Sequence, residues 1–136
     1  MLIIYSPHEK LTEWAYIYAD LLDIFEIEGI LEIGHITAKC YGEAIQAVCF
    51  DAGDCIKIGL NPDEFKADPS ILAHEMIHAK QYLKNELQDF KNFTRFRGKM
   101  YRDTDIYDTS QPWEKEAYAN QKRLYKKSLK RFNLRN

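Results

Sequence analysis

In the first part of the chain, apolar residues recur at spacings of three and four residues, the period of one face of an α-helix. They follow Ser6-Pro-His-Glu9, in which Ser6 suits an N-cap and Pro7 the first helical position, as in a capping box. Gly29 suits the end of the segment. The pattern therefore predicts a helix with one buried face, formed by Leu11, Trp14, Ile17, Tyr18, Leu21, Leu22 and Phe25.

Between residues 30 and 60 the pattern changes to short runs rich in branched residues, which favour strands. The runs at 44–50 and 55–60 flank an Asp-Ala-Gly-Asp segment with the composition of a turn. If Phe50 faces Cys55 across this turn, most apolar side chains fall on one face of the pair. We therefore expect a small antiparallel or mixed sheet whose core face is formed by Ile45, Ala47, Cys49, Ile56, Ile58 and Leu60.

Two more helices are predicted downstream. Asp68-Pro69 suits the start of a helix that ends near Glu86, with Asp68 as the N-cap. Residues 88–111 are irregular and rich in aromatic side chains, with a hairpin indicated around Gly98, and a last helix follows them to about Phe132. The order of elements predicts one α+β domain over residues 1–136.

Composition narrows the class of protein. Of the 136 residues, 46% are hydrophobic and 29% are charged, which is ordinary for a folded domain. No apolar run is long enough to cross a bilayer, and the N-terminal segment lacks the basic start of a signal peptide. Cys40, Cys49 and Cys55 are an odd number without a Cys-x-x-Cys pair, so we interpret them as packing residues. We expect a cytoplasmic protein without membrane contact.

The net charge of −2 hides an asymmetry between the end of the chain and the rest. Residues 120–136 contain seven bases and no acids, whereas the rest of the chain carries 12 bases and 21 acids. A basic end on an acidic body is compatible with an anionic partner such as nucleic acid. The alternative, which we favour, is that these bases line the solvent face and C-terminal end of the last helix.

The chemistry of the chain is concentrated in His74-Glu75-Met-Ile-His78. Two histidines four residues apart in a helix share one face, so both imidazoles can bind one zinc ion. Glu75 follows the first ligand and can take a proton from the zinc-bound water, whose pKa the metal lowers. The motif predicts a Zn²⁺ site with Glu75 as the catalytic general base.

A catalytic zinc needs a third protein ligand, and Glu114 and Glu116 are the candidates. They are two residues apart, about 200° around a helix, so both cannot face one ion. Glu114 lies in the first turn after Pro112, where the helix dipole favours an acid without any metal. We therefore favour Glu116 as the third ligand.

His74 to His78 together with Glu116-Ala-Tyr-Ala-Asn120 resembles the gluzincin metallopeptidases. In these enzymes a glutamate on a second helix completes the zinc site, and an Asp or Asn four residues later orients a histidine. The resemblance implies that Glu116 is the third ligand and that Asn120 supports a ligand histidine. It also implies a minimal zincin fold: a small sheet packed on an N-terminal helix, an active-site helix, and a C-terminal helix with the third ligand.

Residues 55–120 are also similar to a group of short zinc-peptidase-like proteins of phages and bacteria. The similarity lies in Ile58-Gly-Leu-Asn-Pro62, Leu72 to Gln81, Phe96 to Tyr101 and Pro112 to Ala117. In zincins the strand before the active helix is the sheet edge that holds an extended substrate. The resemblance therefore implies a peptide or protein substrate along the strand from Cys55 to Leu60.

Several other residues are weaker candidates. Tyr101 and Tyr107 lie between the two site helices and can donate to a developing oxyanion, but we favour the alternative that they pack over the active helix. His8 and His35 are weaker candidates for that role. Gln81 lies near the face of the two motif histidines and can shape the site.

We expect a zinc-dependent peptidase that hydrolyses peptide bonds with Glu75 as general base. One alternative is a non-catalytic, zinc-stabilised protein-interaction module. Another is a protease similar to the SprT-like proteins, which act on proteins bound to nucleic acid; the basic end of the chain motivates this reading. SprT-like proteins usually have a third histidine where this chain offers a glutamate.

Overall fold

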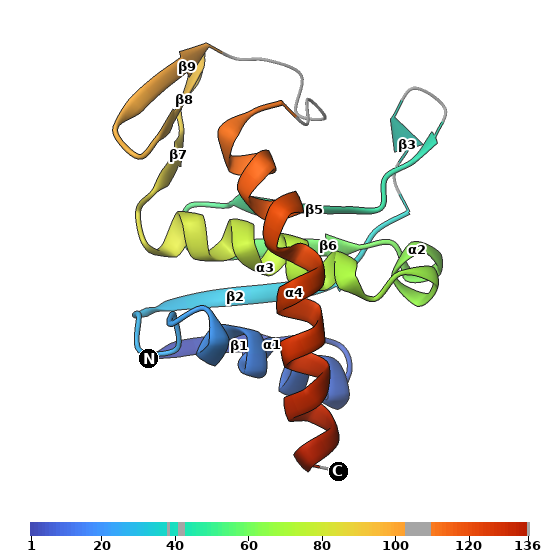
Figure 1. Cartoon of the computed structure of the whole chain (residues 1–136). Coiled ribbons are helices and arrows are strands. Elements are labelled where there is room, and N and C mark those ends of the chain that lie inside the picture. Colours follow the sequence, from blue (N-terminus) through green and yellow to red (C-terminus); the bar gives the residue numbers. More distant parts are fainter. Residues whose placement is uncertain (38, 41–42, 103–109, 136) are drawn as a thin grey trace.

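The computed structural model describes the chain except for residues 38, 41–42, 103–109 and 136, and it shows a mixed α+β fold. Its main sheet has four strands in the order β1-β2-β6-β5 (Figure 1). The strands are β1 (Leu2–Tyr5), β2 (Gly29–His35), β6 (Ile56–Leu60) and β5 (Ala47–Asp51). β1, β2 and β6 are parallel, whereas β5 is antiparallel to β6. The expectation of an α+β fold is confirmed, and its sheet is mixed.

The sequence pattern predicted the faces of the strands but not all of their positions. β1 was not predicted, and the pair expected between Phe50 and Cys55 is shifted by two residues, so that Phe50 faces Lys57. A shift of two preserves the pleat, so the side chains remain on the expected faces. Ile58 and Leu60 are buried, as expected, and Cys49 packs against the core.

The strand from Cys55 to Leu60 is not a sheet edge, which corrects the prediction made for it. β6 pairs with β2 on one side and with β5 on the other, so the edge strands of the main sheet are β1 and β5. The parallel pairing of β6 with β2 joins residues far apart in the sequence, and the local pattern of either strand contains no signal for it. The strand that lies beyond β6 at this side of the sheet is therefore β5.

Four helices accompany the sheet: α1 (Glu9–Leu21), α2 (Pro62–Ala67), α3 (Ser70–Leu83) and α4 (Pro112–Arg135). α1 is shorter than the capping box suggested, because His8 is extended and occupies the N-cap position. The unpredicted α2 begins after Asn61, whose side chain accepts hydrogen bonds from the amides of Asp63 and Glu64. α3 begins one residue later than expected, with Pro69 and not Asp68 at the N-cap position, but the Asp68 carboxylate still accepts from the Ser70 amide (3.1 Å).

Two smaller sheets complete the fold. β3 (Lys39–Cys40) pairs with β4 (Glu43–Ala44), and β7 (Leu87–Asp89), β8 (Phe93–Phe96) and β9 (Lys99–Arg102) form a three-stranded antiparallel sheet. The β8–β9 hairpin lies where it was indicated: Arg97 and Gly98 occupy its turn with φ of 50° and 83°. Cys49 and Cys55 are free thiols. The Cys40 side chain and Tyr107 lie outside the described part of the chain.

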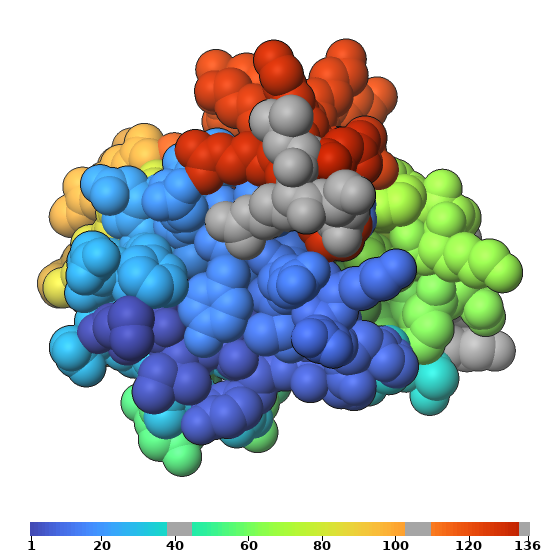
Figure 2. All heavy atoms as spheres, turned by 90° about the horizontal axis from the view of Figure 1, so that it is seen from below, coloured from blue at the N-terminus to red at the C-terminus, as the bar shows by residue number. Residues whose placement is uncertain are grey.

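The helix α3 lies at the centre of the molecule, between the main sheet and α4 (Figure 1). Most of its residues are buried, including both motif histidines. The far end of α4 packs on α1: the Trp14 indole donates to Ser128 Oγ (2.8 Å) and stacks on Phe132. Figure 2 shows this C-terminal part of α4 and the N-terminal segment on one face of the molecule. No helix of the described residues is long and apolar enough to span a membrane.

The sheet core provides a stability test with a matched pair of isoleucines. Ile58 in β6 is 2% exposed, whereas Ile30 in β2 is 38% exposed. We expect Ile58→Ala to lower the free energy of unfolding by about 2–5 kcal/mol, because it removes buried methyl groups and leaves a cavity. Ile30→Ala should cost less than about 1 kcal/mol. Urea denaturation of both variants checks this, and equal losses would contradict the described faces of the sheet.

Candidate metal centre

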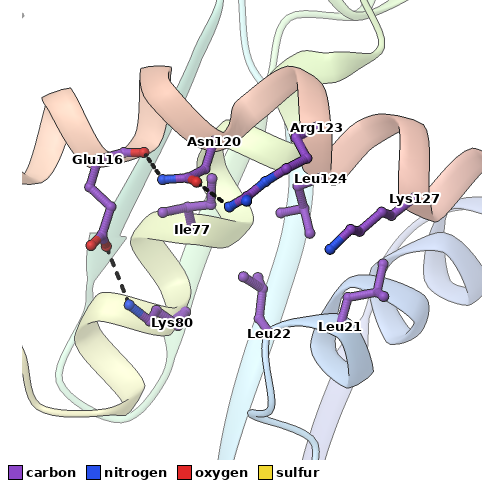
Figure 3. Close-up of a pocket in the computed structure, with 9 residues that line it drawn as sticks. All are labelled: Leu21, Leu22, Ile77, Lys80, Glu116, Asn120, Arg123, Leu124 and Lys127. Carbon is purple, nitrogen blue, oxygen red and sulfur yellow. Dashed lines mark hydrogen bonds and ion pairs between the residues drawn. The ribbon is translucent and has the colours of Figure 1, made fainter.

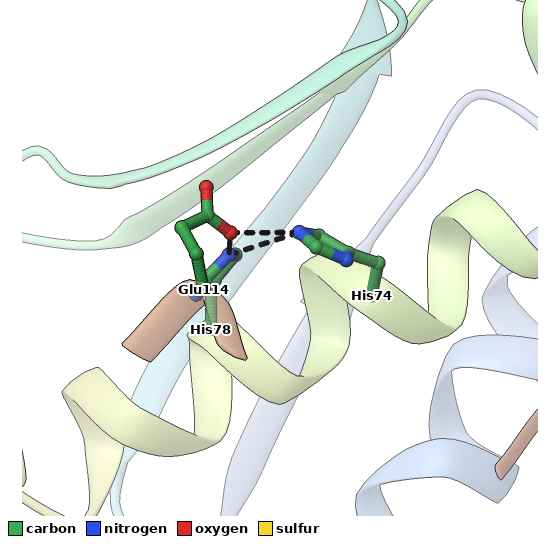
Figure 4. Close-up of side chains that lie close together, drawn as sticks. All are labelled: His74, His78 and Glu114. Atoms are coloured by element: carbon green, nitrogen blue, oxygen red, sulfur yellow. Dashed lines mark hydrogen bonds and ion pairs between the residues drawn. The ribbon is translucent and has the colours of Figure 1, made fainter. Parts of the chain in front are cut away.

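His74 and His78 lie one turn apart on α3, and each is 7% exposed. Their Nε2 atoms are 3.1 Å apart and face the first turn of α4, which contributes Glu114 (Figure 4). Glu114 Oε1 lies 2.9 Å from Nε2 of His74 and 2.7 Å from Nε2 of His78. These three residues can hold a metal ion, since each offers one ligand atom within 4.8 Å of the others.

The structure brings Glu114, and not Glu116, to the two histidines. Glu116 points to the other side of α4, where its Oε1 accepts from Gln81 Nε2 (3.0 Å) and from Lys80 Nζ (3.3 Å). Figure 3 shows the pair of Glu116 with Lys80. As expected, the two acids do not face the same point, but the acid beside the histidines is Glu114 and not the favoured Glu116. The choice depends on how α4 crosses α3, and the helix period does not specify this crossing.

Asn120, which was expected to orient a ligand histidine, also lies away from the site. Its amide donates to the Glu116 carbonyl (2.8 Å) within α4, and its oxygen accepts from Arg123, as Figure 3 shows. The neighbouring residue takes the expected role. Gln121 Oε1 lies 3.0 Å from His74 Nδ1, and Gln121 Nε2 donates to Ser70 Oγ (2.8 Å). The shift from Asn120 to Gln121 follows from the use of Glu114, since residues 114 and 121 are two turns apart on one face.

Gln81 supports the second histidine, in line with the expectation that it shapes the site. Its Oε1 lies 2.8 Å from His78 Nδ1. Its Nε2 donates to the Trp113 carbonyl (3.0 Å) and to Glu116 Oε1, so the orientation of the amide is fixed. The side chain is fully buried. Glu116 therefore contacts the site indirectly, through the amide that holds His78.

These amides determine which ring nitrogens carry protons. Nδ1 of each histidine meets an amide oxygen, so Nδ1 is the protonated nitrogen of each neutral imidazole. The lone pairs of both Nε2 atoms then point towards the Glu114 carboxylate oxygen, which is itself an acceptor. Three acceptors that converge within 2.7–3.1 Å require a shared positive charge. The donor set of two imidazoles and one carboxylate suits a divalent metal ion such as zinc.

The pKa shifts show the same preference for positive charge. Burial alone raises the pKa of Glu114, but hydrogen bonds with His74 and His78 lower that pKa to about 2. Burial alone lowers the pKa of His78, but the hydrogen bond with Glu114 and the charge of Glu75 raise it to about 9. The site therefore stabilises a cationic partner of Glu114, which is a proton on His78 in the metal-free protein.

Glu75 is 6% exposed and lies on the same helix, directly after His74. Burial raises its pKa, and the negative charge of Glu114 raises it further, while the two histidines oppose this shift. Within the described part of the chain, no group donates a hydrogen bond to its carboxylate. Such a carboxylate has the basicity and the vacant acceptor sites that proton transfer requires.

Tyr118 is a site residue that the sequence reasoning missed. Its ring lies against His74, with the centroids 4.4 Å apart. It follows Glu114 by one helical turn, so it would have been found by following the face of Glu114 along α4. Tyr101, for which a packing role was favoured over oxyanion stabilisation, packs edge-on against Trp113.

The chain was compared with family models, with curated proteins and with solved structures, and none of these comparisons gives a match.

The two glutamates of α4 provide a direct test of the ligand set. After zinc loading and dialysis against metal-free buffer, we expect wild-type protein and Glu116→Gln to retain about one zinc ion per chain. Glu114→Gln should retain much less, because it removes the carboxylate between the histidines. Elemental analysis measures the difference. Zinc loss in Glu116→Gln alone would contradict the ligand set.

Adjacent amides of α4 test the hydrogen bonds behind the ligands. Gln121→Ala should weaken zinc binding by about 10–100-fold, because the proton on His74 Nδ1 loses its acceptor. Asn120→Ala should leave the affinity unchanged, since Asn120 does not contact either histidine. Competition with a zinc-binding dye measures both affinities, and the reverse order would restore Asn120 as the supporting residue.

Proposed function

We propose that the protein is a zinc-dependent peptidase with a zincin-like site formed by His74, His78 and Glu114. One observation carries the proposal: the three ligand atoms, from α3 and α4, converge next to Glu75, which lies on the buried helix α3. A metal site alone does not require an acid beside its first histidine. A buried carboxylate with a raised pKa at this position supports hydrolytic chemistry.

The division of roles follows from the position of each group. Bound zinc would supply Lewis acidity to the substrate carbonyl and lower the pKa of water. Glu75 accepts the proton of the attacking water and then delivers it to the nitrogen of the leaving amine. Gln81 and Gln121 hold the two imidazoles in the tautomers that leave Nε2 available. The Tyr118 ring, packed on His74, restricts the rotation of that imidazole.

The proposed substrate is an extended peptide that pairs with β5. This strand is one of the two edges of the main sheet, so one side of its backbone has no partner among the described strands. It lies close to the site, since the charges of Glu75 and Glu114 contribute to the raised pKa of Cys49 in β5, after the larger effect of burial. A peptide added to this edge would gain backbone hydrogen bonds and present its carbonyls near α3.

A second candidate function is a non-catalytic, metal-stabilised interaction module. The same ligand set holds the first turn of α4 against α3, so a metal ion would stabilise the fold without any reaction. A further alternative is that the protein acts on proteins bound to nucleic acid, which the basic residues of α4 would contact. Some of these bases already have protein partners, since Arg131 pairs with Asp20 and Arg123 with Asn120.

Substituting Glu75 by Gln separates catalysis from binding. We expect zinc-loaded wild-type protein to cleave members of a fluorogenic peptide library, and Glu75→Gln to retain zinc but lose activity by about 10²–10⁴-fold, because the amide cannot accept the proton. Cleavage by Glu75→Gln at the wild-type rate would contradict the role of Glu75. A zinc-loaded wild type that cleaves no peptide would favour the interaction module.

A further inference from the structure

The other two histidines of the chain, His8 and His35, lie close together where the neighbouring strands β1 and β2 end. Tyr5 at the end of β1 pairs with Glu32 of β2, and the two strands are parallel. His8 follows Tyr5 by three residues, and His35 follows Glu32 by three residues. Since parallel strands end at the same edge of the sheet, the segments that follow Tyr5 and Glu32 bring their two imidazoles to the same place.

The distance between the two ring nitrogens fits two ligands of one metal ion better than a hydrogen bond. The Nε2 atoms of His8 and His35 are 3.4 Å apart, with the ring centroids 5.5 Å apart and the planes inclined by 50°. This separation is at the long end for a hydrogen bond, since N–H···O hydrogen bonds usually measure about 2.7–3.2 Å. Two histidine nitrogens bound at about 2.0–2.1 Å to one tetrahedral zinc ion lie about 3.3–3.4 Å apart.

The backbone holds both histidines in place. The His8 carbonyl accepts hydrogen bonds from the Ser6 hydroxyl (2.8 Å) and from the Thr12 amide (3.0 Å). His35 is paired with Leu60 of β6 at the end of β2. The imidazoles are therefore presented by two fixed elements, and this reduces the entropy lost when both bind one ion.

The surroundings of the pair leave room for further ligands. Both histidines are exposed. His35 lines a hollow of about 370 Å³, bordered also by Tyr5, Ser6, Pro7, Glu32, Ile33 and Gly34. Glu32, which borders the same hollow, is paired with Lys57 (3.9 Å). Water can therefore complete the coordination of a cation held by the two rings.

We propose that His8 and His35 form a second metal site, for a divalent ion that prefers imidazole, such as Zn²⁺, Ni²⁺ or Cu²⁺. The ion connects the start of α1 to the end of β2, so it stabilises the β1–α1–β2 unit. With two protein ligands in place of three, this site binds more weakly than the centre at His74, His78 and Glu114. The inference is independent of the peptidase proposal, since it uses neither α3 nor α4.

Zinc titration of chelator-treated protein tests the second site. Isothermal titration calorimetry with zinc chloride should show two binding events in wild type, one tight and one weaker. The weaker event should be missing from His8→Ala and from His35→Ala. Glu9→Ala, an exposed substitution beside His8, is the matched control and should keep the weaker ion. Circular dichroism verifies that each variant is folded.

Thermal unfolding provides a second readout. At saturating zinc the melting temperature of wild type and Glu9→Ala should rise further than that of His35→Ala, since an ion that binds the folded state stabilises it. If wild type and His35→Ala bind equal numbers of zinc ions with equal thermal shifts, the second site is refuted. If His74, His78 and Glu114 did not bind zinc, the tight binding event would be absent from all variants. The difference between wild type and His35→Ala in the weaker event would remain.

Discussion

The structure depends on one contact, the crossing of the first turn of α4 over α3, which places Glu114 against the Nε2 atoms of His74 and His78. Three acceptor atoms meet there because the amides of Gln81 and Gln121 hold the opposite nitrogen of each ring. In the absence of a cation this arrangement would be repulsive, since unpaired buried acceptors cost free energy. The surrounding contacts therefore keep together a group of atoms that favours a positive charge at its centre.

The support for this contact extends well beyond the ligands. Behind His74, the chain of hydrogen bonds runs through Gln121 to Ser70, whose hydroxyl donates to Asp68 (2.6 Å) at the start of α3. The segment that leads into the helix and the orientation of its first ligand are thus coupled. A network of this kind restricts the side chains to one arrangement, which is what a preorganised site requires.

Behind His78, the support reaches the three-stranded sheet. Gln81 donates to Glu116, and Glu116 is paired with Arg97 in the β8–β9 turn and with Lys80 on α3. Lys80 also binds Glu86 (2.8 Å), next to the start of β7. The small sheet thus helps to fix the rotation of α4 about its own axis. This rotation determines which of the two glutamates faces the histidines.

Local sequence signals predicted the parts of the site that lie within one helix. The spacing of His74 and His78, with Glu75 between them, was sufficient because a helix alone brings residues four apart together. Glu114 could not be chosen over Glu116 in this way, because the choice requires the phase of α4 relative to α3. The same limit applied to β6, whose interior position depends on a parallel partner far away in the sequence. β1, with only Leu2 and Ile4 buried, was too short for its alternation to be recognised.

The most direct test of the central claim is anomalous diffraction at the zinc edge from crystals of the zinc-loaded protein. We predict an anomalous difference peak about 2.0–2.2 Å from Nε2 of His74, Nε2 of His78 and the carboxylate of Glu114. Zinc-loaded crystals without a peak between these three atoms, or with the ion bound to Glu116 instead, would contradict it.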